Sequence, residues 1–188
     1  MTKQNKRRLG AAVLLGAAAL ALGAWLTWRA GVFLPRAAAR TAACPLRGDG
    51  SVQTVALAGG AVTVSDGGTQ VFCTDRACRA EDFCTGDIDG DGAQELLVLI
   101  WRRGSFGSVR PFWVKKNDTG WSQHIFIYRW KDGAPQPVWM SSALRPRVKT
   151  WALQADGTLD IQTPAGEDTR WAWRSWGLER IDKPPAAF

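Results

Sequence analysis

The sequence predicts a mainly β protein: an antiparallel meander, forming a partial β-propeller-like or stacked-sheet domain, preceded by one N-terminal transmembrane helix. Three observations predict this. Short apolar segments alternate with Gly-, Asp- and Asn-containing turns over residues 51–188, which is typical of strands and hairpins. No long segment of helical periodicity occurs there. An uncharged run occupies residues 9–28 near the N-terminus.

The uncharged run has the length of a membrane-spanning helix. Its 20 residues would rise about 30 Å, the thickness of a hydrocarbon core. Basic residues precede it, and Trp25 and Trp28 lie at its far end, where aromatic rings favour the interface. We expect an uncleaved signal-anchor over residues 9–28. A cleaved signal peptide, cut near residues 37–39, is the alternative.

This anchor predicts the domain organisation and the location. Residues 1–8 form a cytoplasmic N-terminus, residues 29–50 a linker, and residues 51–188 an extracytoplasmic β domain. The expected location is the cell membrane, with a single pass and the C-terminal domain outside, in a bacterial envelope. The short basic N-terminus favours this orientation.

The net charge of +7 does not indicate a nucleic-acid-binding surface. The first 48 residues hold eight of the 24 basic side chains and none of the 17 acidic ones, so the remainder has 16 basic against 17 acidic. The positive charge therefore belongs to the targeting segment, and we expect no nucleic-acid partner.

The strands can be placed by their flanking turns. Gly59-Gly60 predicts a hairpin between residues 52–57 and 61–65. Residues 95–101 form a short, apolar, buried strand. The other predicted strands cover residues 69–73, 111–116, 121–130, 135–142, 148–154, 159–163 and 169–181.

One predicted strand has two apolar faces. His124, Phe126 and Tyr128 alternate with Ile125 and Ile127, so we expect a layer on each side of this strand. The histidine is expected to be packed in the core. We expect most of the tryptophans to be buried packing residues, with an aromatic platform for a sugar or peptide as the alternative.

A weak internal repeat links the strand–turn–strand segments. The stretch "LQADGTLDI" resembles a degenerate copy of the earlier "GDIDGDGAQEL". Residues 49–188 could supply about three propeller blades of about 40–50 residues. Closed propellers have at least about four, which predicts an open array or one completed by a partner.

The four cysteines all follow the apolar run. Cys44, Cys73, Cys78 and Cys84 would lie in a compartment that permits disulfides. We expect at least one disulfide among the last three, with no choice between pairings. A zinc site is disfavoured because there is no Cys-x-x-Cys pair.

The segment after residue 86 has the pattern of a calcium loop. Asp87, Asp89 and Asp91 are spaced by two residues, Gly92 permits a sharp turn, and Glu95 follows. With the carbonyl of Ala93, these five residues are the predicted metal ligands, and calcium is the predicted cofactor because it accepts six to eight oxygens. A solvated Asp/Gly turn without metal is the alternative.

The loop "DIDGDGAQEL" resembles the calcium-binding loop of FG-GAP/VCBS-type repeats, the blades of integrin-α-like β-propellers. Asp87, Asp89, Asp91, Gly92 and Glu95 match that pattern, as does Leu96. Glu95 stands where the family more often has Asp. The resemblance covers about 15 residues, and it implies a role in blade stability and adhesion.

These features predict a binding or envelope-assembly module rather than an enzyme. We expect a membrane-anchored, calcium-stabilised β domain with an envelope protein or polysaccharide as partner, and no catalytic residues. An accessory subunit of an envelope complex is the first alternative. A carbohydrate-active hydrolase is the enzyme alternative, because paired carboxylates can hydrolyse glycosides.

Overall fold

A computed structural model describes residues 3–104 and 119–182, and it places the backbone alone for residues 3–12. The strand predicted at residues 111–116 lies outside this range. The chain divides into two compact units, Met1–Pro35 and Arg36–Phe188. Each unit is described by itself.

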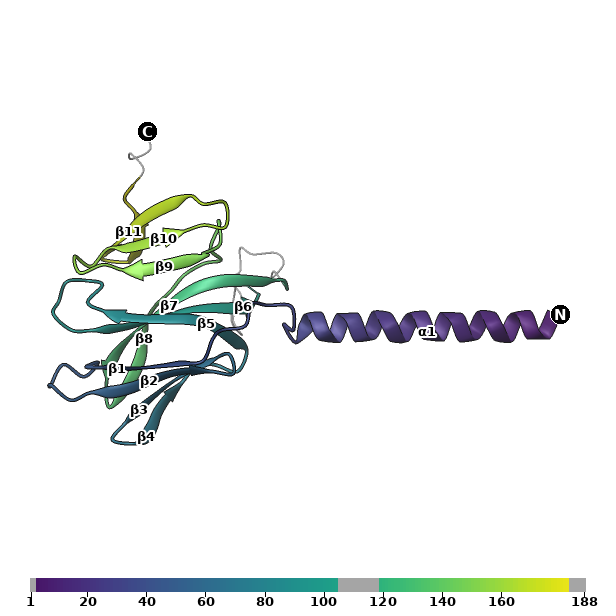
Figure 1. The fold of residues 1–188 in the computed structure, drawn as a ribbon, viewed down its shortest axis with the longest axis horizontal. Helices are drawn as coiled ribbons and strands as arrows, with labels where there is room; N and C mark the ends of the chain where they lie inside the picture. The colour runs from purple at the N-terminus through teal and green to yellow at the C-terminus, as the bar shows by residue number, and fades with distance from the viewer. Residues whose placement is uncertain (1–2, 105–118, 183–188) are drawn as a thin grey trace. The chain divides into compact units, whose positions relative to one another are not determined.

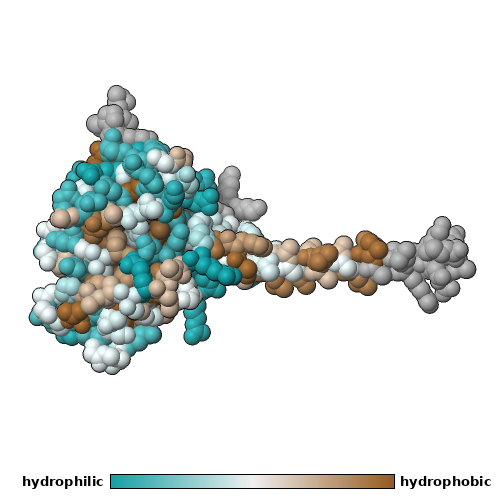
Figure 2. All heavy atoms as spheres, viewed as in Figure 1, coloured by the Kyte–Doolittle hydropathy of each residue, from teal (hydrophilic) through white to brown (hydrophobic). Residues whose placement is uncertain are grey.

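The first unit is built on one helix, α1 (Lys3–Arg29), which contains the predicted segment 9–28. It ends before Gly31, whose φ of 69° suits a helix C-terminus. Its apolar side chains are exposed, including Val13, Leu15 and Leu20 (Figure 2). Within the described part of the chain, no helix combines the length and hydropathy needed to cross a membrane. The helix is thus confirmed, and its membrane-spanning role stays a prediction.

The second unit contains three antiparallel sheets of four strands each, so the mainly β prediction is confirmed (Figure 1). In each sheet the strands follow one another in chain order, as in a meander. The first sheet comprises β1 (Arg40–Cys44), β2 (Gln53–Ala58), β3 (Ala61–Asp66) and β4 (Thr69–Cys73). The central sheet comprises β5 (Cys78–Gly86), β6 (Glu95–Arg103), β7 (Trp121–Lys131) and β8 (Ala134–Met140). The last sheet comprises β9 (Thr150–Leu153), β10 (Leu159–Gln162), β11 (Asp168–Arg174) and β12 (Gly177–Arg180).

The central sheet has an apolar core on each face. On one side, Val98, Phe126 and Tyr128 pack with Val55 and Val64 of the first sheet. On the other, a separate cluster joins the central sheet to the last sheet. Its members are Leu97, Leu99, Ile125, Ile127, Leu159, Ile161 and Leu178, with Ile88 and Val148 from loops. The three sheets therefore stack face to face, with the central sheet in the middle.

The two-faced strand prediction is confirmed by β7. Phe126 and Tyr128 belong to the first cluster and Ile125 and Ile127 to the second. His124 is buried, with 2% of its surface exposed, as predicted. The Gly59-Gly60 hairpin is also confirmed between β2 and β3. Both glycines have positive φ, 59° and 77°, which matches a type I′ turn.

The predicted linker over residues 29–50 is wrong in its second half. β1 lies within it and pairs along its whole length with β2. Arg40 anchors this strand, because its guanidinium bonds to Asp82 and to the carbonyl of Phe83. Cys44 and Leu46 are buried in the first core cluster. The Ala- and Arg-rich composition did not indicate a strand here, because strand formation depends on the tertiary contacts that hold β1 in place.

The predicted disulfide is not formed, because all four cysteines are free thiols. Cys73 is exposed at the end of β4, while Cys78 and Cys84 lie on the same strand, β5. A bulge near Ala80 shifts the register of β5, and the two thiols face different core clusters. Closeness in sequence predicted a bridge, but an extended strand carries neighbouring side chains apart.

Candidate metal centre

The acidic loop is the connection between β5 and β6, in the central sheet. Gly86 and Glu95 are paired residues at the ends of these two strands, so residues 87–94 close a hairpin. Gly90 and Gly92 have φ values of 77° and 89°, in the left-handed region that glycine tolerates. The hairpin brings the ends of the loop together, as the spacing of its carboxylates predicted.

Asp87 organises the loop through backbone hydrogen bonds. Its Oδ1 accepts the N–H groups of Gly90 and Asp91 at 2.7 and 3.1 Å, and its Oδ2 accepts that of Gly92 at 2.9 Å. An Asp side chain that satisfies nearby N–H groups stabilises a tight turn. Asp87 therefore shapes the loop whether or not it also binds a metal.

The structure brings three of the five predicted ligands together. Carboxylate oxygens of Asp87, Asp89 and Glu95 lie within 4.8 Å of one another. Glu95 is fully buried, and its Oε2 accepts the N–H of Ile88 at 3.2 Å. Burial raises the pKa of the Glu95 carboxyl, while the bond from Arg129 opposes that rise. These three carboxylates are the candidate metal centre.

Asp91, the fourth carboxylate among the predicted ligands, lies outside that group of oxygens. Asp91 is exposed, and its Oδ1 accepts the N–H of Ala93 at 2.8 Å. The N–H of Ala93 donates to Asp91 within the loop. The contribution of the Ala93 carbonyl to metal binding stays a prediction.

Sequence reasoning missed the main cationic partner of the loop, Arg129 on β7. Its Nε donates to Glu95 Oε1 at 2.8 Å, and its Nη2 donates to Asp89 Oδ2. Nη2 also lies 3.4 Å from Asp91 Oδ2. Leu96 pairs with Tyr128, so the same register places Glu95 and Arg129 opposite each other. The signal was an arginine between Tyr128 and Trp130 of β7, and its interpretation required the register between β6 and β7.

The donor set suits a hard divalent cation. Calcium binds carboxylate oxygens in flexible geometries, and crowded carboxylates favour a nearby positive charge. Asp87, Asp89 and Glu95 supply such oxygens. The Arg129 guanidinium already supplies one positive charge to two of them. Calcium would therefore have to share or replace the contacts of Arg129.

The degenerate second loop, which contains Gly157, lies against the acidic loop. It forms the turn between β9 and β10, where Gly157 has a φ of 76°. A Cβ atom on Gly157 would lie 3.2 Å from the carbonyl oxygen of Asp87, so the two loops are in close contact. Asp156 bonds to Thr158 within its own turn, and Asp160 pairs with Arg170.

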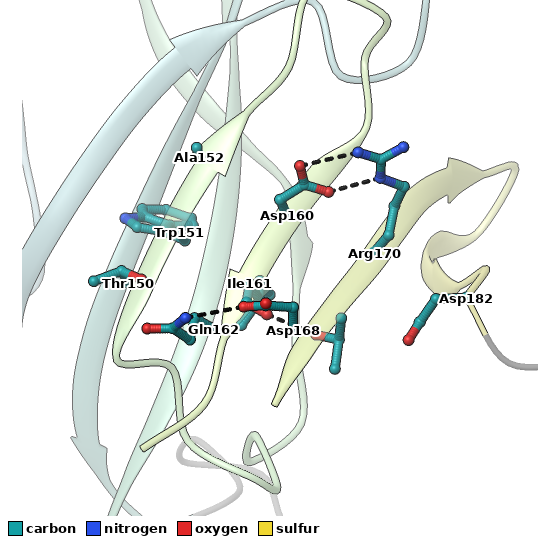
Figure 3. A pocket seen from close by; sticks show the side chains of 10 residues that line it. Thr150, Trp151, Ala152, Asp160, Ile161, Gln162, Asp168, Arg170 and Asp182 are labelled. Atoms are coloured by element: carbon teal, nitrogen blue, oxygen red, sulfur yellow. Dashed lines mark hydrogen bonds and ion pairs between the residues drawn. The ribbon is translucent and has the colours of Figure 1, made fainter. Parts of the chain in front are cut away.

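A shallow depression covers the outer face of the last sheet (Figure 3). Arg170 donates to both carboxylate oxygens of Asp160, at 2.7 and 3.1 Å, and Gln162 donates to Asp168 at 3.0 Å. Figure 3 shows these pairs side by side across the strands. The polar groups of this face therefore bond largely to one another.

His124 and Ser122 form a second polar pair, on β7. The Ser122 hydroxyl lies 2.9 Å from Nε2 of His124, and Nδ1 lies 3.0 Å from the carbonyl oxygen of Ser141. Burial lowers the pKa of the His124 imidazole, which favours its neutral form. A neutral ring that donates through Nδ1 to the Ser141 carbonyl accepts a hydrogen bond from the Ser122 hydroxyl at Nε2. Both ring nitrogens are thus satisfied within the core.

Comparison of the chain with protein-family models, curated proteins and solved structures gave no match. The similarity to FG-GAP/VCBS repeats therefore rests on the residues of the acidic loop.

Proposed function

We propose that this chain is an extracytoplasmic binding or envelope-assembly module, built as a partial, propeller-like array. One observation carries this proposal: three consecutive four-stranded meanders stack face to face, with the acidic loop at the first turn of the central one. The residues of this loop are those by which the chain resembles FG-GAP/VCBS-type repeats.

We further propose that α1 anchors the β unit to a membrane. The uncharged run over residues 9–28 follows a basic segment. Val13, Leu14 and Leu20 expose 65%, 73% and 78% of their surface. Contiguous apolar surface of this kind is stable when lipid or protein covers it. A membrane-bound helix would place residues 1–8 inside and the β unit outside.

A reagent that cannot cross membranes tests this topology through Cys73, the exposed thiol. An impermeant maleimide added to intact spheroplasts should label the full-length chain. The Cys73→Ser variant should lose that label, which assigns the reaction to this residue. Labelling that requires lysis would contradict the extracytoplasmic location.

The binding surface that we propose centres on Trp176, while Trp139 and Trp173 are half-buried and pack against the second core cluster. The rings of Trp139 and Trp173 are 6.3 Å apart in an edge-to-face arrangement. Trp176 lies in the turn before β12 and exposes 70% of its surface. Exposed indole rings stack on sugars and on apolar side chains. We therefore propose an envelope polysaccharide as the ligand, with an envelope protein as the alternative.

Co-sedimentation of the detergent-solubilised full-length chain with purified cell-wall polysaccharide tests this surface. Loss of a stacking contact of about 1 kcal/mol should weaken binding of Trp176→Ala about fivefold. Val52→Ala is the matched control, because Val52 is also exposed, at 57%, but lies before the first sheet's β2. Equal binding by both variants would contradict the proposed surface.

Calcium is the cofactor that we propose for the acidic loop. The converging oxygens of Asp87, Asp89 and Glu95 support it. Glycoside hydrolysis is a weaker alternative. Two of the three carboxylates, those of Asp89 and Glu95, are already bonded to Arg129.

A further inference from the structure

The strand register shows which end of the β unit the chain enters. Arg40 begins β1 and pairs with Leu57, and the turn at Gly59-Gly60 follows at the same end. The carbonyl oxygen of Gly60 accepts the N–H of Ala80 at 2.7 Å, so this turn lies against the start of β5. Because β5 pairs with β6, and β6 with β7, the end of β6 and the start of β7 also lie there.

Exposed basic side chains gather at this end, which we call the basic end. Arg79 contacts the Gly59-Gly60 turn, and it pairs across the strands with Trp101 near the end of β6. The Arg147 guanidinium lies 5.7 Å from the centre of the Trp101 ring. In the described part of this unit, no acidic side chain forms an ion pair with the exposed cations Arg76, Arg79, Arg145, Arg147 and Lys149.

The loop before β9 brings residues 145–149 to the basic end. The N–H of Leu144 donates to the carbonyl oxygen of Gln123 at 2.8 Å. The Gln123 side chain accepts the N–H of Val148 at 2.6 Å and donates to its carbonyl oxygen at 3.1 Å. Gln123 exposes 1% of its surface near the start of β7, so the core of the central sheet fixes the position of this loop.

Acidic side chains at the same end are bonded to other groups. Oε2 of Glu81 accepts two hydrogen bonds, from the Trp101 indole and the Gln123 amide, at 2.6 and 2.7 Å. The ion pairs at this end are Asp82–Arg40 and, on the last sheet, Glu167–Arg180 and Asp182–Arg180. These carboxylates therefore leave the exposed cations of the basic end unneutralised.

The other end of the β unit is acidic. Its turns and hairpin ends hold Asp66, Asp132 and Asp156, together with Asp87, Asp89 and Asp91 of the acidic loop. Residues 49–188 have 16 basic against 17 acidic side chains, so the basic end reflects a separation of charge along the strands and not an excess of it. A separation of this kind orients a protein near a charged surface.

We propose that the basic end of the β unit binds the surface of an anionic phospholipid membrane, through the headgroup phosphates. This inference rests on the proposed anchoring role of α1. Residues 30–39 join α1 to β1, and ten residues span at most about 35 Å, so the chain reaches the basic end first after the helix. Basic side chains are attracted to an anionic leaflet within a Debye length of it. A nucleic acid offers the same phosphates, but the apolar helix that precedes this end favours lipid.

The test measures how closely the basic end approaches lipid headgroups in the full-length chain. The chain is reconstituted into nanodiscs of phosphatidylcholine, alone or with an equal part of phosphatidylglycerol, and both carry a lipid with a nitroxide quencher on its headgroup. A fluorophore on Cys73 reports on the basic end, because this exposed thiol ends β4 and pairs with Thr63 of β3. A chain with Cys73→Ser and Thr69→Cys carries the fluorophore at the acidic end of the same strand.

Phosphatidylglycerol should increase the quenching of the fluorophore on Cys73 but not of that at residue 69, and high salt should remove the increase. The double variant Arg79→Gln, Arg147→Gln loses two cations of the basic end. Each loss should weaken docking about fivefold, so the ratio of docked to undocked chains should fall about 25-fold.

The matched control is the double variant Lys131→Gln, Arg174→Gln, because both side chains are exposed cations at the acidic end. It should be quenched as wild type is. Quenching that does not depend on phosphatidylglycerol, or that falls equally in the two double variants, would overturn the proposal. Binding of a random-sequence DNA duplex that only the basic-end substitutions abolish, with no response to phosphatidylglycerol, would assign the surface to nucleic acid instead.

Flotation with vesicles separates this inference from the proposed anchor. Wild-type chain that floats with neutral vesicles, without a response to phosphatidylglycerol in the quenching experiment, would support the anchor and overturn the docking surface. Chain that floats only with anionic vesicles, and not when it carries Arg79→Gln and Arg147→Gln, would support the docking surface and contradict the anchor. Chain that floats with neither would overturn both.

Discussion

The backbone of Gly177 lies directly against the indole ring of Trp139. A Cβ atom on Gly177 would be 2.3 Å from Nε1 and 2.7 Å from Cε2 of that ring. Gly177 also has a φ of 150°, a conformation that other residues rarely adopt. The contact joins β12 of the last sheet to β8 of the central sheet, so a side chain at residue 177 would separate the two.

We expect Gly177→Ala to destabilise the protein by about 2–4 kcal/mol, because backbone strain and overpacking both contribute. Urea unfolding measures the loss. Gly166→Ala is the control: Gly166 has a positive φ of 84°, but a Cβ atom on it would meet no other atom within 4 Å. It should cost about 1–2 kcal/mol. Equal losses would show that the contact with Trp139 contributes nothing.

Stability should fall on mild acidification because of His124. Burial holds the pKa of its imidazole below the ordinary value of 6.5. The unfolded chain then binds a proton at a higher pH than the folded one, so His124 contributes stability above pH 6.5 that is lost as the pH falls through the folded pKa. The free energy of unfolding of wild type should therefore decrease from about pH 7 to about pH 5 more than that of His124→Gln.

A nuclear magnetic resonance titration checks the same residue directly. The chain has one histidine, so the imidazole signal of the untagged protein needs no further assignment. Titration at or above pH 6.5 in the folded protein would contradict the predicted destabilisation.

The four thiols should differ sharply in reactivity. Cys73 is exposed, whereas burial raises the pKa of Cys78 to about 11 and that of Cys84 to about 12. Because the thiolate is the reactive form, iodoacetamide at pH 8 should modify Cys73 first in the folded protein. All four should react after unfolding without reductant. A peptide cross-linked by a disulfide, found by mass spectrometry, would contradict this pattern.

Arg40 should be important for holding β1 in the first sheet. Its guanidinium lies 3.9 Å from the centre of the Phe83 ring and bonds to Asp82. Both charged side chains are partly exposed, so we expect Arg40→Gln to cost about 1 kcal/mol. Hydrogen exchange at residues 40–44 should accelerate in this variant. It should stay unchanged in Arg174→Gln, and equal acceleration in both would indicate a general loss of stability.

The sequence predicted those parts of the fold that local chemistry determines. Gly59-Gly60 set a hairpin, and the two apolar faces of residues 124–128 indicated a layer on each side. β1 was missed because Ala and Arg have weak strand preference, and its pairing with β2 depends on tertiary contacts. The predicted disulfide failed because sequence proximity does not show which way a thiol points from β5.

For the candidate site, spacing predicted that Asp87, Asp89 and Glu95 converge, as they do, but it also included Asp91, which lies outside their group of oxygens. It could not reveal Arg129, which is 34 residues from Glu95 along the chain. Their contact depends on the register between β6 and β7, and that register is set by the apolar faces of both strands. Long-range ion pairs of this kind follow from the fold and not from any local motif.

The two outer faces of the stack of sheets differ in the side chains that they carry. Asp160–Arg170 and Gln162–Asp168 already bond to each other on the outer face of the last sheet, and a further layer would have to remove water from charged groups for little apolar contact. Outward positions of β1 and β2 in the first sheet instead hold neutral Thr and Ala. The polar outer face of the last sheet therefore disfavours the addition of a further sheet, as the polar outer faces of terminal repeats do in extended arrays. These polar pairs therefore disfavour a head-to-tail filament of identical chains through that end.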